Sequence, residues 1–319
     1  MIVEHLRPAK VAGKYPLVFI HGKAQTSSNW ITTPDGRKGW AQYFVEQGYE
    51  VYLVDQPARG RSAYHPEFNG KPHRFSAPVI EKMFTAAAEL GNWPQAKKHT
   101  QWPGSGRMGD PVFDQFYASQ VESLASNADS AKLITSAGIK LLDKIGPAVL
   151  ITHSQAGPFG WSIADARPQL VKGIVALEPS GPPIQSTPIF KSKKQQPWGL
   201  TNIPITYDPP VTDPAEIQVE QQAVPDRPDL AMCWIQKEPA RQLPTLRNIP
   251  ILMLTSESSY HAEYDHCVAK WLIQAGVSNT QFVRLEDVGV RGNGHMMMLE
   301  KNNLKIAELL NNWVQNNIH

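Results

Sequence analysis

Short apolar runs rich in β-branched residues alternate with longer amphipathic stretches along this chain, and this alternation limits its fold more than any other feature. Apolar residues at nearly every position are typical of strands that a parallel sheet buries on both faces. Strands are predicted at 17–20, 49–55, 148–152, 173–177, 251–255 and 281–285, with an edge strand at 2–6. Helices are predicted between them at 40–47, 116–144, 161–167, 264–275 and 296–314. The expected fold class is α/β, with a mostly parallel central sheet flanked by helices.

Composition narrows the classes of function. The 319 residues are 41% hydrophobic and 19% charged, enough to bury a large core. A net charge of +2 gives no electrostatic reason to expect a nucleic-acid or membrane partner. The longest apolar runs fall far short of the roughly 18 residues that would span a bilayer. No signal-peptide pattern is visible at the N-terminus. A soluble protein is therefore expected, with a cytoplasmic location favoured.

One region interrupts the alternation of strands and helices. Residues 179–250 hold 14 of the 27 prolines, which defeat regular helix and sheet. We expect an α/β core over 1–180 and 248–319, with 181–247 inserted as a proline-rich lid or cap. Its apolar residues, including Phe190, Trp198 and Trp234, are candidates to line a pocket; an irregular surface excursion is the alternative. The irregular segment 62–114 is a second candidate to cross the pocket mouth.

Two cysteines, Cys233 and Cys267, lack the spacing of a metal or redox motif. Two ordinary half-buried thiols are the favoured interpretation. A disulfide between them is the alternative, and it would indicate an oxidising compartment.

The strongest local signal is the hexapeptide THSQAG at 152–157, which follows a predicted strand and precedes a predicted helix. Such a strand, sharp turn and helix raise a serine hydroxyl above the sheet as a nucleophile elbow. Ala156 and Gly157 are small enough for the tight turn, although Thr152 stands where glycine is usual. Ser154 is therefore the predicted nucleophile.

The other predicted catalytic groups lie in loops after strands. His21 and Gly22 follow the strand 17–20, where the fold builds its oxyanion loop, so the amides of Lys23 and Gln155 are candidate oxyanion donors. His295, in the sequence GNGH after the last strand, is the predicted general base. His261 and His266 compete with it, but both fall beside a predicted helix and are interpreted as surface histidines.

The identity of the acid stays open at this level. In folds with a nucleophile elbow, the acid usually lies in the loop after the strand that 251–255 would form. Glu257 is the first carboxylate of that loop. Glu178, however, ends the strand 173–177 beside the elbow, in the crevice where such sheets bind ligands. A surface glutamate that starts a loop is the structural alternative for Glu178.

Several stretches together resemble the Alcaligenes-type bacterial carboxylesterases of the α/β-hydrolase superfamily. They are IHGKA at 20–24, TTPDGRKGW at 32–40, VDQPARGRS at 54–62, THSQAG at 152–157, LEPSGP at 177–182 and GNGHM at 292–296. The resemblance implies a Ser-His-Glu triad whose acid matches Glu178, and oxyanion donors that match Lys23 and Gln155. Where that family carries paired cysteines, this chain has Lys23 and Ala24. The family often forms homodimers, although no interface signal is visible in this sequence.

The sequence therefore predicts a serine hydrolase that cleaves a small carboxylic ester or lactone through an acyl-enzyme. No metal or organic cofactor is expected, because the sequence contains no phosphate loop or dinucleotide fingerprint. Two alternatives remain. One is a lyase or acyltransferase on the same fold, and the other is a ligand-binding protein with a vestigial site.

Overall fold

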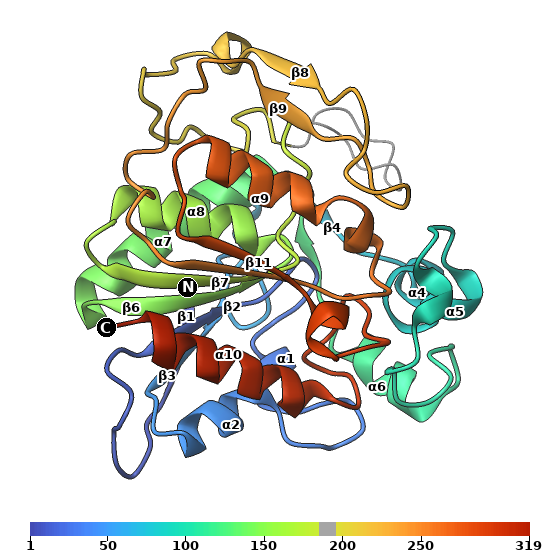
Figure 1. The fold of residues 1–319 in the computed structure, drawn as a ribbon. Coiled ribbons are helices and arrows are strands. Elements are labelled where there is room, and N and C mark those ends of the chain that lie inside the picture. Colours follow the sequence, from blue (N-terminus) through green and yellow to red (C-terminus); the bar gives the residue numbers. More distant parts are fainter. Residues whose placement is uncertain (185–195) are drawn as a thin grey trace.

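A seven-stranded sheet runs through the computed structural model, which describes residues 1–184 and 196–319 (Figure 1). Its strands, in spatial order, are β1 (Ile2–Leu6), β3 (Val51–Asp55), β2 (Leu17–Ile20), β6 (Ala148–His153), β7 (Val171–Leu177), β10 (Ile251–Thr255) and β11 (Thr280–Arg284). β1 is antiparallel to β3, and every other neighbouring pair is parallel. The predicted strands and fold class are confirmed, because apolar runs buried on both faces make the interior of such a sheet.

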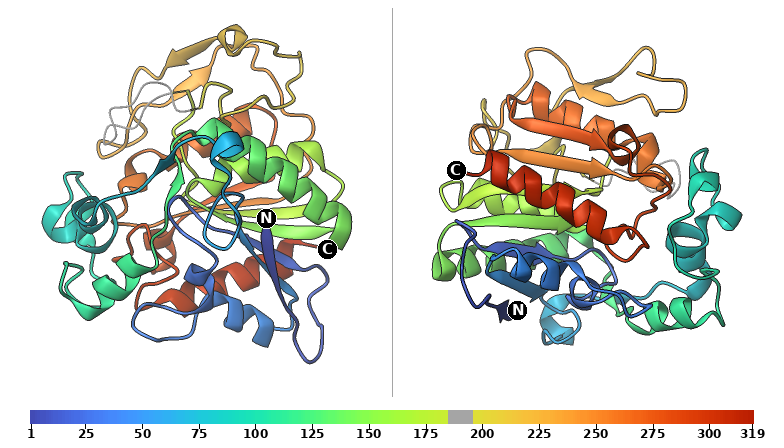
Figure 2. Two further views of the ribbon diagram at one scale, coloured as in Figure 1. Left: turned by 180° about the vertical axis from the view of Figure 1, so that it is seen from behind. Right: turned by 60° about the horizontal axis from the view of Figure 1, so that its bottom comes forward.

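Helices cover both faces of the sheet (Figure 1 and the two views of Figure 2). α7 (Asn127–Ile145), α8 (Ala156–Ala166) and α9 (Asp265–Gln274) cover one face, while α2 (Trp40–Glu46) and α10 (Asn303–Asn317) cover the other. Side chains of β6 alternate between the two cores: Leu150 packs toward α7 and α8, and Val149 and Ile151 pack toward α10.

The helix predicted at 116–144 is wrong, since two helices cover that range. α6 (Pro111–Ala118) starts at Asp110, whose side chain accepts hydrogen bonds from two helical N–H groups. α7 starts after Ser126, which caps it in the same way. Between them β5 (Ser123–Leu124) pairs with β4 (Pro72–His73). The helix predicted from 296 likewise begins only at Asn303.

The remaining elements are short. They are α1 (Ser28–Ile31), α3 (Pro66–Asn69), α4 (Ala77–Ile80), the π-helical turn η1 (Glu81–Thr85), α5 (Ala87–Leu90), and the 3₁₀ turns η2 (Ala96–Lys98), η3 (Pro214–Glu216), η4 (Tyr260–Glu263) and η5 (Leu285–Val288). No helix in the described ranges is long and apolar enough to cross a membrane.

The described part of the proline-rich insertion packs on the α8 and α9 face of the core. It contains the hairpin of β8 (Val219–Gln221) and β9 (Trp234–Gln236), above α9 in Figure 1. Leu200, Tyr207 and Leu243 are buried in the core cluster that includes α8 and α9. Trp198 packs against this cluster, and Phe190 lies outside the described residues. The division at 181–247 stays a prediction.

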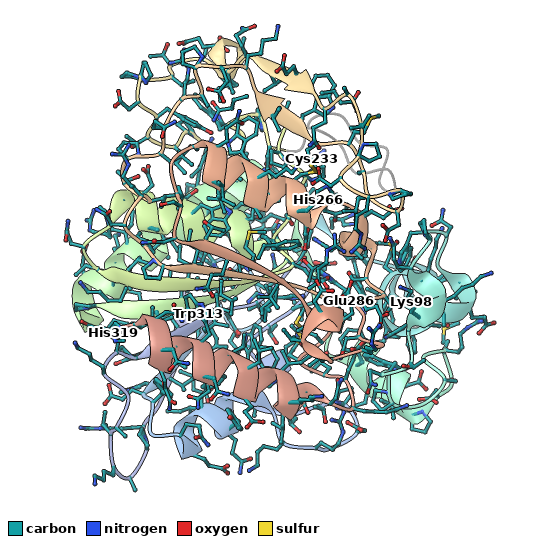
Figure 3. All side chains as sticks on the ribbon, in the orientation of Figure 1. Lys98, Cys233, His266, Glu286, Trp313 and His319 are labelled. Carbon is teal, nitrogen blue, oxygen red and sulfur yellow. A yellow bond between two sulfur atoms is a disulfide. The ribbon has the colours of Figure 1, made fainter. Side chains whose placement is uncertain are left out.

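The two cysteines form a disulfide, so the expectation of free thiols is wrong. It joins Cys233, beside β9, to Cys267 on α9, with 5.2 Å between their Cα atoms. Figure 3 shows Cys233 next to His266 on α9. The pairing depends on the insertion folding back onto α9, which a sequence separation of 34 between the cysteines does not reveal.

The order of the strands determines where a ligand site forms. β3 lies on one side of β2 and β6 on the other, so the chain reverses direction across the sheet between these strands. At such a switch point the loops after the carboxyl ends of the strands separate and leave a crevice. The predicted nucleophile follows β6, and the predicted oxyanion loop follows β2.

Candidate active site

Ser154 occupies the sharp turn between β6 and α8. Its φ of 56° is in the left-handed region, which a residue with a side chain rarely adopts. The Ser154 N–H donates to the carbonyl of Leu177 on β7 (2.9 Å), which anchors the turn to the neighbouring strand. A Cβ at Gly157 would approach the Cβ of Pro179 to 2.3 Å, so only glycine fits there. This is the geometry of a nucleophile elbow.

The loop after β2 lies directly against this elbow. A Cβ added at Gly22 would lie 3.0 Å from the Cβ of Ser154 and 3.0 Å from Nδ1 of His153. The next amide, that of Lys23, and the amide of Gln155 donate to no acceptor within residues 1–184 and 196–319. Two unused N–H groups beside a serine have the composition of an oxyanion hole.

His295 and Glu178 are directly hydrogen-bonded. Nδ1 of His295 donates to Oε2 of Glu178 at 2.5 Å, and both side chains are almost completely buried. The carboxylate requires the proton on Nδ1, so Nε2 keeps its lone pair. Nε2 lies 3.5 Å from the Tyr260 hydroxyl. Ser154, Tyr260 and His295 line the same cavity, so the structure brings the predicted serine and histidine to one site.

The Glu178 carboxylate is held from two further directions. The backbone N–H of Ser256 donates to Oε1 (2.8 Å), and the Ser259 hydroxyl donates to Oε2 (2.5 Å). Glu178 itself turns sharply after β7, with φ of 44°, and its N–H donates to the carbonyl of Leu254. Together with His295, these donors satisfy a carboxylate that is inaccessible to water.

Glu257, the alternative acid, has different partners. Its carboxylate accepts from Nη1 of Arg291 (3.0 Å) and from the N–H of Gly292 (3.0 Å), and Nζ of Lys98 lies 3.5 Å away. These contacts attach Glu257 to the loop that precedes His295.

His261 and His266 are buried, so their interpretation as surface histidines is wrong. The His261 ring stacks on His295, with centroids 4.8 Å apart and planes 8° from parallel. Its Nδ1 donates to Asp265 (2.7 Å). Burial lowers the pKa of His261, but the charges of Asp265 and Glu178 outweigh burial and raise this pKa above its usual value. Burial, reinforced by His261, holds the pKa of His295 well below its usual value.

The loop that carries His295 is fixed to the core by other polar contacts. His153 lies within hydrogen-bond distance of the His295 carbonyl (Nε2 to O 3.0 Å), and burial keeps the pKa of His153 low. The carboxylate of Glu300 accepts from the Gly294 N–H (2.9 Å) and from Asn293 (2.7 Å). A histidine in a Gly-rich loop is thus held in one orientation.

These groups line a cavity of about 310 Å³ at the carboxyl end of the sheet. Its lining residues come from the end of β6, from the loops after β2, β6, β7, β10 and β11, and from the segment 62–127: Gly22, Lys23, Gln25, His73, Phe75, Phe84, Asn127, His153, Ser154, Gln155, Ser180, Tyr260, His295 and Met296. The segment 62–114, in teal at the side of Figure 1, does reach the cavity through its aromatic residues. Trp198 and Trp234 do not line it, because that part of the insertion packs on α8 and α9 instead.

Sequence reasoning missed several residues of this site. Ser259 and Tyr260, which contact Glu178 and His295, lie in the loop after β10, where the sequence offered Glu257 as an acid and His261 as a competing base. The cluster of serines at 256, 258 and 259 after β10 was the available signal. The segment 62–114, which contains Phe84, was expected at the pocket mouth, but nothing in the sequence singled out Phe84 within it or indicated Asn127, because their approach to the cavity depends on how 62–127 folds back.

Within residues 1–184 and 196–319, two groups of side chains have donor atoms close enough for a metal ion. In one, the ligand atoms of Glu178, His261 and His295 all lie within 4.8 Å of one another. Both Nδ1 atoms of these histidines are already bonded to carboxylates. In the other, Cys233 and Cys267 are oxidised to a disulfide, which removes their thiolates.

Comparison with known proteins identifies the family. A model of the alpha/beta hydrolase family matches residues 17–309, and the chain belongs to this family. It is 47% identical over 314 residues to "Probable secreted lipase phiG" of a fungal species (strain ATCC 74256), covering 98% of this chain and 85% of that protein. The solved structure of a novel bacterial esterase superposes with a TM-score of 0.66 and 24% identity, over 99% of this chain and 85% of the other.

Proposed function

We propose that this protein is a serine hydrolase of carboxylic esters, with Ser154 as nucleophile, His295 as general base and Glu178 as the acid. The observation that carries the proposal is the buried bond between Nδ1 of His295 and Glu178, which leaves Nε2 unprotonated in the cavity that the elbow serine also lines. Membership of the alpha/beta hydrolase family and the likeness to a lipase support it.

The proposed reaction has two stages. Nε2 of His295 takes the Ser154 proton while the serine oxygen attacks the ester carbonyl, and the amides of Lys23 and Gln155 stabilise the oxyanion. The imidazolium, stabilised by Glu178, then gives this proton to the departing alkoxide and leaves an acyl-enzyme. Water activated by the same nitrogen attacks the acyl-enzyme, and the acid product leaves. A cyclic ester follows the same steps, so lactones are included among the proposed substrates.

The proposed location is an oxidising compartment outside the cytoplasm, which replaces the cytoplasmic expectation. A disulfide persists where the redox environment does not reduce it. A relative described as a secreted lipase supports the same location.

Covalent labelling tests the nucleophile. A fluorophosphonate probe should label the wild-type protein on Ser154, as read by peptide mass spectrometry. Ser154→Ala should lose the label and several orders of magnitude of kcat on p-nitrophenyl esters. Ser180→Ala is the matched control, because this serine lines the same cavity and should leave labelling intact. Labelling of Ser154→Ala at wild-type level would refute the assignment.

A further inference from the structure

Lys23 brings an ammonium group to the cavity without a carboxylate partner. Its Nζ donates to Oδ1 of Asn127 (3.2 Å), which is a neutral amide. In the part of the chain that the structure describes, the lysine ion pairs are made by Lys38, Lys98 and Lys270 instead. Residues 185–195 contain no Asp or Glu, so they offer no carboxylate either. The counter-ion of Lys23 must therefore come from outside this chain or be absent.

A second cation lies behind the first. The guanidinium of Arg59 is buried and donates to the carbonyl of Gly22 (3.1 Å) and to Oε1 of Gln155 (3.3 Å). Burial, together with the charge of Arg59, lowers the pKa of Lys23 to about 8. Lys23 is still mostly protonated at neutral pH. Two neighbouring cations on one side of a partly buried cavity repel each other, so binding of an anion beside them is favoured.

The other side of the cavity is aromatic. The ring of His295 lies 5.2 Å from Phe84 and 5.0 Å from Tyr260. In ester cleavage the leaving alcohol must stay within reach of the general acid, so the alcohol part lies on this side. The acyl part then extends away from His295, toward Lys23, Asn127 and Gln155.

We propose that the substrate is a monoester of a dicarboxylic acid, whose free carboxylate binds Nζ of Lys23. This inference rests on the proposed ester hydrolysis and specifies the acyl group. Asn127 supplies a further amide beside the ammonium and begins the 19-residue helix α7, whose N-terminus also favours an anion. Lys23 stands next to the elbow, where an ion pair can select the acyl group.

Two benzyl esters of equal size test this selection: benzyl hydrogen adipate, and the neutral compound in which a primary amide replaces its carboxylate. Release of benzyl alcohol at pH 7 gives kcat/KM for each. The wild-type protein should prefer the acid by about 10- to 100-fold, the range for a hydrogen bond to a charged group. The ratio of the two values cancels any general loss of catalysis.

Variants then assign the preference. Lys23→Met should reduce the ratio to near one, whereas Lys10→Met, an exposed site with the same charge change, should keep it. Asn127→Asp provides an independent test, because an internal carboxylate beside Nζ should compete with the substrate and also lower the ratio. The inference is overturned if the wild-type protein shows no preference, or if the ratio is unchanged in Lys23→Met. In either case, hydrolysis of the amide ester still supports the proposed ester hydrolysis. Release from neither ester overturns the inference too, and labelling of Ser154 then decides whether the proposed function falls with it.

Discussion

The loops after β7 and β10 each carry a glutamate at the carboxyl end of the sheet, yet the two carboxylates have different surroundings. Glu178 is completely buried and accepts hydrogen bonds from His295, Ser256 and Ser259. Glu257 pairs with Arg291, whose side chain is 67% exposed, and with Lys98. Neighbouring strands thus offer two candidate acids, and only one has a histidine as its partner.

The difference follows from local backbone conformation. Glu178 adopts φ of 44° immediately after β7, and the loop after β10 folds over it so that Ser256 and Ser259 become its donors. In that second loop Ser258 binds the carbonyl of Asn293 through both its N–H and its hydroxyl. The loop after β10 therefore supports both Glu178, the proposed acid, and the loop of His295, although Glu257 itself bonds to neither His295 nor Ser154.

The largest expected effect is that of Glu178→Gln. An amide cannot hold His295 in the tautomer that accepts the serine proton, and the equivalent change in a serine protease costs about 10,000-fold in kcat. Initial rates on a p-nitrophenyl ester measure this loss, with circular dichroism to verify folding. A folded Glu178→Gln protein with wild-type turnover would show that the acid lies elsewhere.

His261→Gln tests the contribution of the loop after β10 to the base. The general base must be unprotonated, and the low pKa of His295 should keep kcat/KM high below pH 6.5 in the wild-type protein. Glutamine cannot carry the charge that helps to lower this pKa, so the acidic limb of the profile should move to higher pH. A several-fold loss of kcat/KM without movement of that limb would assign His261 a packing role alone.

Glu257→Gln should change kcat by no more than a few-fold, because its carboxylate is bonded to Arg291 and Gly292 rather than to His295. Loss of these contacts should cost about 1 kcal/mol of unfolding free energy, measurable in urea. A Glu257→Gln protein as inactive as Glu178→Gln would reverse the comparison of the two loops.

The smallest effect on kcat is expected for the double variant Cys233→Ser with Cys267→Ser, which alters neither loop. Removing a link that closes 34 residues should lower the unfolding free energy by about 2–4 kcal/mol while turnover at 25 °C stays near wild type. Thermal unfolding under oxidising and reducing conditions measures the difference. The wild-type protein should respond to reductant, and the double variant should not.

The sequence could predict much of this fold because its signals are local. Strands such as 17–20 and 251–255 match the observed bounds, since an apolar run of that length identifies a buried strand by itself. The helix expected at 116–144 failed, because apolar periodicity continues across Gln120 to Ala125 while Ser126 starts a new helix. Polar capping competes with periodicity there, and capping decides the boundary.

The residues of the candidate site also fall into two groups, those that local motifs indicated and those that only tertiary contacts define. Ser154 and His295 could be proposed from motifs of a few residues, and the competition between Glu178 and Glu257 could at least be stated. The contacts of Tyr260 and the stack of His261 on His295 could not be predicted, and the bond between the cysteines could be stated only as the alternative to free thiols. Each joins segments that lie far apart in the chain or depends on the direction of a side chain.

By itself, then, the sequence determined the parallel sheet, the elbow serine and a late histidine, since short stretches of backbone and side-chain chemistry specify them. The tertiary structure decided which carboxylate faces that histidine and which residues line the cavity. The physical reason is that burial and hydrogen-bond direction arise only when loops from β7, β10 and β11 pack together. The same packing leaves Lys23 beside the elbow without a carboxylate partner among the described residues, a property that no single motif contains.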